Sequence, residues 1–455
     1  MKKRCLFLAI VMAAFMLLTA CNGQSSKAPS TPAAPQTPQT QSSPQAESAA
    51  PASPDSPANG EDVHLVYWSM WNSTEPQAWI IMTAIRDFEA KNPGVKVEIN
   101  WAGREIRQTL APAIDNGMKI DIFDEDTQRV NENWGRYLLN LEKFYAQTYP
   151  TTDGKPYQNV VMPALQSLSR SFSADGGLYT VGYQPFAFIF MYNKGHFERA
   201  GIASVPTTWE EFVSACEKLK AAGFIPLTSD NEYISGLFGY HLARLKGADF
   251  GTELVNDTSG ALWDDPAVLA TAKAIESLVK AGYFDRNAGG NIWPAGQQDI
   301  ALETVTMYLN GTWLVNEIMG STGPDFPWGS FNYPAVSGGV SGLEAANYGS
   351  QAFAINKDCA NPEKAFELLV HLTTGEWDAM LAQESFGVPV AGTTDWPKQL
   401  GEAKSVFESL TVCYPWVAGI EGNTDMGPVV RQNVQRLVGG TITAEQFVAN
   451  CKSGN

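Results

Sequence analysis

The chain has 455 residues and carries 31 Lys and Arg against 48 Asp and Glu, a formal net charge of −17. It exceeds one ordinary domain and can bury a large core. We expect no nucleic-acid partner, because nucleic-acid recognition depends on clustered cations. The sequence has no HExxH, GxSxG, GxxxxGK[ST] or GxGxxG motif, so nothing in it indicates a metal or a cofactor.

The N-terminus has the pattern of an export signal. A basic start at 2–4 precedes an apolar run at 6–18 that is too short for a typical membrane span. The following Leu-Thr-Ala-Cys, which ends at Cys21, resembles the bacterial lipobox, in which the Cys is lipidated and becomes the new N-terminus. We therefore expect a signal peptide at 1–20 and a lipid anchor on Cys21. An ordinary cleaved signal followed by a chance Cys is the alternative.

A low-complexity segment follows the signal. Residues 24–60 contain no Val, Ile, Leu, Met or aromatic side chain and consist mostly of Pro, Ser, Ala, Thr and Gln. Such a segment cannot bury enough apolar surface to offset the entropy of ordering it. The sequence therefore predicts a disordered tether over 21–61.

Strands and helices alternate in the next part of the chain. The pattern predicts strands at 64–68, 95–101 and 120–123, a helix that ends at 92–94, and a helix at 105–116. Thr74 and Gln77 have the spacing of a capping box at the first helix start. The β-α-β-α-β order predicts a parallel sheet, and ligands of such sheets bind beyond the carboxyl ends of the strands.

Polar side chains and one indole follow two of these strands. An indole can stack on a sugar ring, and amide and carboxylate groups can bind neighbouring hydroxyls. The acidic residues can instead begin a helix, because negative charge is favoured there. The candidate binding residues in this part are Trp71, Asn72, Arg104, Asp124, Glu125 and Asp126.

An apolar and aromatic run at 178–194 organises the middle of the chain. Its second part, Phe186 to Tyr192, has the pattern of a strand buried on both faces. Pro185 cannot donate to a sheet ladder, so the chain is expected to bend or change sheets there. We interpret this run as a crossover between two lobes, with the ligand near Tyr183 and Gln184.

The second half repeats the pattern of strands followed by polar residues. A helix is predicted after Thr207, with Glu210 completing a capping box, and strands are predicted at 225–227 and 305–309. Segment 348–355 is expected to be a second crossover with Gly349 as a flexible hinge, 361–371 a helix, and 386–390 a third crossover. The candidate binding residues here are Asp230, Glu232, Tyr233, Trp313, Gly349, Asn423 and Asp425.

The cysteines show no CxxC spacing. Cys216 lies on the apolar face of a predicted helix and is expected to be a buried free thiol. Cys413 and Cys451 are a possible disulfide, although sequence alone cannot choose among the pairings.

Several short motifs occur in an order typical of one family. They are Leu-Tyr-Thr-Val-Gly-Tyr from Leu178, Met-Tyr-Asn-Lys from Met191, Phe-Glu-Arg-Ala-Gly-Ile from Phe197, and Pro-Thr-Thr-Trp-Glu-Glu-Phe from Pro206. Together they resemble the extracellular solute-binding proteins of bacterial ABC sugar importers, the maltose-binding-protein-like family 1. Asn310-Gly311-Thr312-Trp313 resembles that family's Asn-Gly-x-Trp, which implies that Trp313 stacks on a bound sugar. The family varies most in its sugar-contacting loops.

The resemblance implies an α/β fold with two lobes of the periplasmic-binding-protein type II, each a mainly parallel sheet flanked by helices, joined by three crossings. The expected lobes are 62–184 with 351–386 and 185–350 with 387–455. It further implies a monomeric, non-enzymatic receptor on the extracytoplasmic face of the membrane. The expected partners are a sugar or small oligosaccharide, held between the lobes, and the transmembrane subunits of an ABC permease.

Three alternatives remain open at this point. A secreted carbohydrate-active enzyme needs only two suitably spaced carboxylates, which 48 acidic residues can supply. A binding protein for a non-sugar solute has a similar outline in sequence. A sensor module that signals to a membrane kinase instead of a permease is the third.

Overall fold

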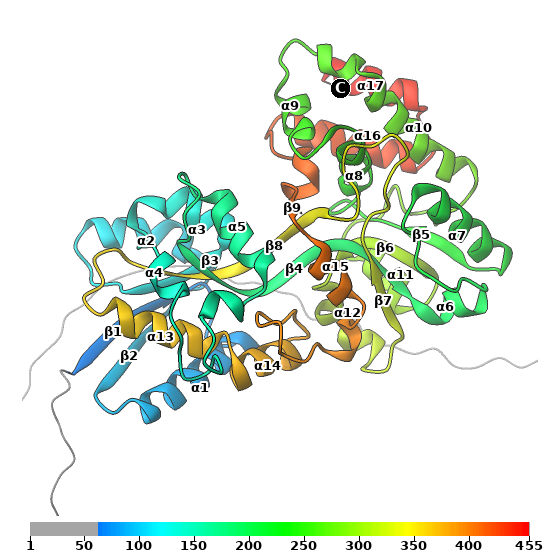
Figure 1. The fold of residues 1–455 in the computed structure, drawn as a ribbon. Coiled ribbons are helices and arrows are strands. Elements are labelled where there is room, and N and C mark those ends of the chain that lie inside the picture. The colour runs from blue at the N-terminus through cyan, green and yellow to red at the C-terminus, as the bar shows by residue number, and fades with distance from the viewer. Residues whose placement is uncertain (1–61, 455) are drawn as a thin grey trace, which may run out of the picture. The chain divides into compact units, whose positions relative to one another are not determined.

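A single mixed β-sheet organises the protein (Figure 1). The computed structural model describes residues 62–454, so the predicted signal peptide, the lipid on Cys21 and the predicted tether lie outside the described residues. The strands are β1 (Val63–Ser69), β2 (Val95–Trp101), β3 (Ile122–Asp126), β4 (Thr180–Asn193), β5 (Ile225–Thr228), β6 (Val305–Gly311), β7 (Trp328–Phe331), β8 (Ala345–Ile355) and β9 (Val412–Cys413). Their order is β2-β1-β3-β8-β4-β6-β5, with β7 paired to β4 and β9 paired to β8.

The helices of the described residues alternate with these strands. They are α1 (Pro76–Lys91), α2 (Ile106–Asp115), α3 (Thr127–Trp134), α4 (Glu142–Tyr145), α5 (Pro163–Phe172), α6 (Lys194–Arg199), α7 (Trp209–Ala221), α8 (Ser235–Lys246), α9 (Phe250–Asn256), α10 (Pro266–Lys280), α11 (Ala295–Ala301), α12 (Leu314–Thr322), α13 (Pro362–Leu372), α14 (Gly375–Glu384), α15 (Ala403–Ser409), α16 (Met426–Val438) and α17 (Ala444–Ser453).

The two ends of the sheet have the parallel pairing that the strand-helix alternation predicts. β1 pairs in parallel with β2 and β3, and β5 pairs in parallel with β6. Between these ends, the long strands β4 and β8 run antiparallel to each other and to their neighbours β6 and β3. The α/β fold class that the sequence predicts is confirmed.

The chain stays in one sheet at Pro185, so of the two outcomes predicted there, a bend or a change of sheets, the change of sheets does not occur. The pairing of β4 with β8 instead shifts register between Tyr183 and Pro185. Gln184, the extra residue, has a φ of +45°. A β-bulge of this kind accommodates a residue that lacks an N–H donor, because the ladder is already interrupted there.

Helices far apart in sequence pack together on each end of the sheet (Figure 1). α13 and α14 pack on α1, beside the β2-β1-β3 end, and α3 packs on α5 and β8. At the other end, α10 contacts α8, α16 and α17. Helices from the C-terminal part of the chain therefore pack at both ends of the sheet, α13 and α14 at one end and α16 and α17 at the other.

Two predicted helix caps differ from the structure. The capping box expected for Thr74 and Gln77 is wrong, because Glu75 occupies the N-cap of α1 without a side-chain cap and Pro76 begins the helix. At α7 the capping box is present but lies one residue later than predicted, between Thr208 and Glu211. Each helix start has several neighbouring residues that could serve as the N-cap, so residue spacing alone did not determine which one does.

The cysteines of the described residues are free thiols. Cys216 is buried in α7, as predicted, and burial raises the pKa of its thiol far above the ordinary value. Cys413 and Cys451 are also free thiols, so the possible disulfide between them is not formed.

Candidate functional site

A cavity of about 340 Å³ lies at the middle of the sheet, where β4 and β8 cross from one end to the other. Segments from the whole length of the described chain contribute to it. Its lining residues are Trp71, Gln77, Gln184, Pro185, Phe186, Thr312, Trp313, Asn316, Gln351, Ser385, Phe386, Gly387 and Trp416.

Burial along the two long strands marks the position of this cavity. Every residue of β4 is buried except Gln184 and Phe186, and every residue of β8 is buried except Gln351. All three of these residues line the cavity. The strands therefore expose side chains only where the cavity opens between the packed ends of the sheet.

Aromatic rings form much of the cavity wall. Trp71 follows β1, Trp313 directly precedes α12, and Trp416 starts a short 3₁₀ helix after β9. Trp313 contacts Phe186 at a ring-centroid distance of 5.4 Å and Trp416 at 6.4 Å. Indole faces of this kind provide flat apolar surface for a ring-shaped ligand.

The polar part of the lining consists of amides and hydroxyls. Among the described residues that line the cavity, none carries a side chain that is charged at neutral pH. The Nε2 of Gln184 donates to the Oγ of Ser385 at 2.9 Å. The Oε1 of Gln351 is buried and accepts no hydrogen bond from the described residues. An orphaned acceptor of this kind is costly unless a water or a ligand donates to it.

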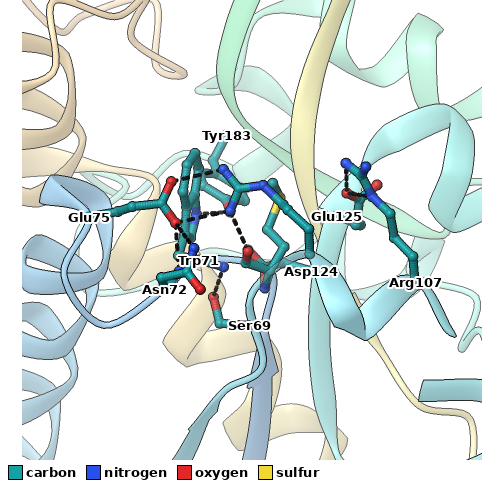
Figure 2. Close-up of polar contacts among 10 residues, drawn as sticks. Ser69, Trp71, Asn72, Glu75, Arg107, Asp124, Glu125 and Tyr183 are labelled. Carbon is teal, nitrogen blue, oxygen red and sulfur yellow. Dashed lines mark hydrogen bonds and ion pairs between the residues drawn. The ribbon is translucent and has the colours of Figure 1, made fainter. Parts of the chain in front are cut away.

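A hydrogen-bonded chain holds Trp71 from behind (Figure 2). The indole Nε1–H donates to the hydroxyl of Tyr183 at 2.7 Å. Tyr183 in turn donates to Asp124 through a short hydrogen bond, and the other carboxylate oxygen of Asp124 accepts from the backbone N–H of Met70 at 2.9 Å. Burial raises the pKa of Asp124 from 3.8 to about 6.

Three predicted residues, Trp71, Gln184 and Trp313, come together in the cavity lining. Tyr233 lies just behind this lining, with its ring 6.0 Å from that of Trp313. Gly349 also lies behind the lining, opposite Phe186 in the sheet. Its φ lies outside the left-handed region, and a Cβ there would meet the Cζ of Phe186 at 2.4 Å. Its role as a flexible hinge stays a prediction.

The acidic residues at 124–126 do not form the predicted loop, because they belong to strand β3 itself. Asp124 and Glu125 are fully buried. Successive side chains in a strand face opposite sides, and Glu125 points toward Arg107 at 2.6 Å (Figure 2). Glu125 also pairs with Arg129 at 2.8 Å. Asp126 caps α3 by accepting from Arg129 N at 3.2 Å, which is the helix-start role left open as an alternative.

The other predicted residues lie outside the cavity lining. Asn72 and Arg104 both bind Glu75, and the Arg104 guanidinium also lies 4.9 Å from the centre of the Trp71 ring. Asp230 is buried and accepts from the Tyr308 hydroxyl at 2.7 Å, whereas Glu232 is exposed. Asn423 lies just before α16, and its Oδ1 accepts from Asp425 N and Met426 N.

Sequence reasoning missed several lining residues, of which Trp416 and Gln351 are the most informative. Trp416 lies in a short segment that no periodic pattern describes, directly before two residues with positive φ angles, Val417 and Ala418. Gln351 left only a weak signal, since strand 345–355 is mostly apolar but contains a second amide, Asn347. The same holds for Gln77, a buried polar residue on the apolar face of α1.

Residues 62–454 contain neither a candidate metal cluster nor a helix suited to spanning a membrane. No group of three or more His, Cys, Asp or Glu side chains in this part of the chain is arranged to hold a metal ion. Over the same residues, none of the helices combines the length and the apolar character that crossing a membrane requires.

Comparisons with known proteins agree in the kind of protein that they find. The family model described as bacterial extracellular solute-binding protein matches residues 71–379, more than half of the chain. An uncharacterised ABC transporter extracellular-binding protein of Pyrococcus horikoshii is 23% identical over 317 residues, which are 67% of this chain and 67% of that protein. A multiple sugar-binding protein of Streptococcus mutans serotype c is 24% identical over 299 residues, 64% of this chain and 67% of that protein.

Solved structures show the same fold. RafE from Streptococcus pneumoniae, in its apo form, aligns with a TM-score of 0.68 at 18% identity and covers 87% of this chain and 98% of its own. The structure of RafE in complex with raffinose aligns with a TM-score of 0.60 at 20% identity, covering 86% of this chain and 98% of its own. At these identities the likeness shows the fold.

Proposed function

The chain belongs to the bacterial extracellular solute-binding proteins of ABC transporters, and from that premise we propose that it binds a neutral sugar or small oligosaccharide in the cavity at the middle of the sheet and delivers it to an ABC permease. The observation that carries this proposal is the composition of the cavity lining. The lining combines the indoles of Trp71, Trp313 and Trp416 with uncharged amide side chains. One of these amides, Gln351, has a buried Oε1 that accepts no hydrogen bond from the described residues.

This lining suits a pyranose ring. The C–H faces of a sugar pack on indole rings, while its hydroxyls need partners that both donate and accept. The amides of Gln77, Asn316 and Gln351 supply such partners. A cavity of about 340 Å³ lies at the small end of ligand pockets, which span roughly 300–1,000 Å³. These features favour a small saccharide over a long polymer.

The charge of the lining bears on the alternative of a non-sugar solute. An amino acid, a polyamine or a phosphate carries formal charge, and burying it requires an opposite charge in the site. The cavity-lining residues within 62–454 include no Asp, Glu, Lys, Arg or His. The lining therefore favours a neutral ligand.

The same feature bears on the alternative of a carbohydrate-active enzyme. Glycoside hydrolysis uses a pair of carboxyl groups on either side of the scissile bond. Asp124, a carboxyl group close behind the lining, is fully buried and bonded to Tyr183 and Met70. It is therefore shielded from a ligand in this cavity, and the lining favours binding without turnover.

Binding is coupled to closure in this proposal. The cavity is lined by residues from both ends of the sheet, such as Trp71 beside β1 and Trp313 after β6. A sugar that contacts both ends stabilises the arrangement in which they are closest, and so shifts the equilibrium toward it. The basic and apolar N-terminus and the lipobox-like Cys21 support attachment of the receptor to the outer face of the cell membrane.

A thermal-shift screen of the protein against mono-, di- and trisaccharides tests the proposal, with charged amino acids and polyamines as controls. We expect at least one neutral saccharide to raise the melting temperature, and calorimetry with that sugar to give saturable binding. Chromatography of the ligand after overnight incubation should return it intact. Hydrolysed sugar would establish the enzyme alternative, and a shift with charged solutes alone would overturn the assignment of the ligand class.

A further inference from the structure

The indole of Trp71 is fixed on more than one side. Its Nε1–H donates to Tyr183, its backbone N–H donates to the Oγ of Ser69 at 3.2 Å, and the Arg104 guanidinium covers its ring (Figure 2). Trp71 is nevertheless a wall of the cavity. Whatever sets its orientation also sets the shape of the cavity on that side.

Tyr183 has the two hydrogen-bonding roles that the chain of contacts needs. An indole N–H can only donate, so the Tyr183 oxygen must accept from Trp71 and use its own proton elsewhere. That proton goes to Asp124. The Tyr183 ring is itself held by stacking on Phe353, with centroids 4.1 Å apart and planes inclined by 16°. Burial raises the pKa of Tyr183 well above its usual range, so its hydroxyl stays protonated.

Asp124 completes this chain only as a carboxylate. Its Oδ1 faces the N–H of Met70 and its Oδ2 faces the O–H of Tyr183, so both oxygens meet donors. A proton on Oδ1 would oppose the Met70 N–H. A proton on Oδ2 would oppose the Tyr183 hydroxyl, which would have to turn away. Protonation therefore weakens at least one link.

We propose that Asp124 and Tyr183 are positioning residues for the ligand cavity: the Asp124 carboxylate orients the Tyr183 hydroxyl, which anchors the indole of Trp71 as a cavity wall. Neither residue is part of the cavity lining, and both are fully buried. The link to ligand affinity rests on the proposed function, whereas the link between Asp124 and the Trp71 indole does not.

The anchoring is sensitive to pH in a defined range. Burial raises the pKa of Asp124 to about 6, so the carboxylate form is lost as the pH falls through that value. The titratable groups that face this carboxyl are the phenols of Tyr67, from β1, and Tyr183, from β4, and both stay protonated. Phe353 of β8, paired opposite Asp124, does not titrate. The charged Arg104 reaches the carbonyl of Met70, and Glu125 faces the other side of β3.

The test uses the ligand-free full chain with 15N-labelled tryptophan, so it does not depend on knowing the sugar. The indole N–H signal of Trp71 is identified by its absence from the spectrum of Trp71→Phe. We expect this signal to move with pH, with a midpoint near pH 6 and an upfield direction as the pH falls, because the Tyr183 oxygen is a weaker acceptor once its own proton no longer binds a carboxylate. In Tyr183→Phe, which keeps the ring on Phe353, the signal should lie upfield at all pH values and not titrate.

Asp124→Asn should also abolish the titration, with circular dichroism confirming that the variant folds. Asp378→Asn is the matched control, since Asp378 is another buried carboxyl with its pKa raised to about 6, and it binds Val390 N and Ala391 N instead of Tyr183. The control should leave the Trp71 titration unchanged. A Trp71 signal that is constant from pH 5 to 8 in the native chain, or that still titrates in Asp124→Asn or in Tyr183→Phe, would overturn the proposal.

The consequence for binding is measured separately. With a saccharide found in the screen, Tyr183→Phe should weaken affinity about tenfold at pH 7.5, and the affinity of the native chain should fall as the pH drops below 6. If no saccharide binds, the proposed function fails while the indole titration still decides the positioning role. If a saccharide binds with the same affinity in Tyr183→Phe, the positioning role fails while the proposed function stands.

Discussion

The indole of Trp313 lies nearly parallel to the ring of Phe188, with centroids 6.2 Å apart and planes inclined by 8°. Phe188 is fully buried in β4, whereas Trp313 is half-buried and lines the cavity. Trp313 therefore has one side in the aromatic core and another side toward the ligand. Its substitution should affect both stability and binding, in proportions that depend on the replacement.

Trp313→Ala should lower the free energy of unfolding by about 2 kcal/mol, because it removes a half-buried aromatic ring, and should abolish binding of the saccharide. Trp313→Phe keeps the contact with Phe188 and should cost less stability while still weakening binding about tenfold. Urea denaturation and calorimetry separate the two effects. A Trp313→Phe protein with native affinity would mean that the indole serves the core alone.

Trp416→Ala should weaken saccharide binding about tenfold with little loss of stability. Trp416 lines the cavity but is 38% exposed, so truncation removes a ligand surface more than it opens the core. Trp79→Ala is the control, because Trp79 is 54% exposed on α1 and outside the lining. Calorimetry should find native affinity in Trp79→Ala. Equal losses in both variants would indicate a general effect of removing surface indoles.

Gly349→Ala should destabilise the protein by about 1–3 kcal/mol through overpacking and should also weaken ligand binding. Its new Cβ would lie 2.4 Å from the Cζ of Phe186, a ring that lines the cavity. Thermal unfolding with and without the saccharide measures both effects. The added substitution Phe186→Ala should relieve the overpacking, so that the second change costs less stability in the Gly349→Ala background than in the native one.

The matched control for that substitution is Gly320→Ala in α12, where a Cβ meets no atom within 4 Å. It should leave binding unchanged and stabilise the helix by up to about 1 kcal/mol, because alanine has the higher helix propensity. A destabilised Gly320→Ala protein would contradict the steric explanation, which depends on the space available at each glycine.

His241 should make the protein less stable in mild acid. Burial lowers its pKa from 6.5 to about 3, and the ring stays neutral between Trp209 and Tyr333. The unfolded chain takes up a proton below pH 6.5 while the folded chain does not, so the free energy of unfolding falls as the pH drops from about 6.5 toward 3. Urea denaturation between pH 7.5 and 5 should show this loss to be smaller in His241→Gln. Identical pH slopes would contradict a neutral buried imidazole.

Periodicity and punctuation in the sequence were sufficient for most local structure and for the α/β fold class. The apolar runs at 95–101 and 305–309 lie within β2 and β6, and Cys216 is the buried thiol that its helical spacing predicts. The sequence also predicted three residues that line the same cavity, Trp71, Gln184 and Trp313. Each of them follows or interrupts a buried strand. Ligand binding by these three residues stays a prediction.

Only the tertiary structure decided which polar residues face the cavity. Asp124, Glu125 and Asp126 are consecutive acids in the sequence, yet one anchors Tyr183, one binds two arginines and one caps α3. Gln351 and Trp416 reach the cavity from segments that no local pattern marks as neighbours of Trp71. Hydrophobic periodicity is a property of nearby residues, so it determines strands and helices. The direction in which a side chain meets a partner three hundred residues away depends on strand pairing and packing, which the folded sheet alone fixes.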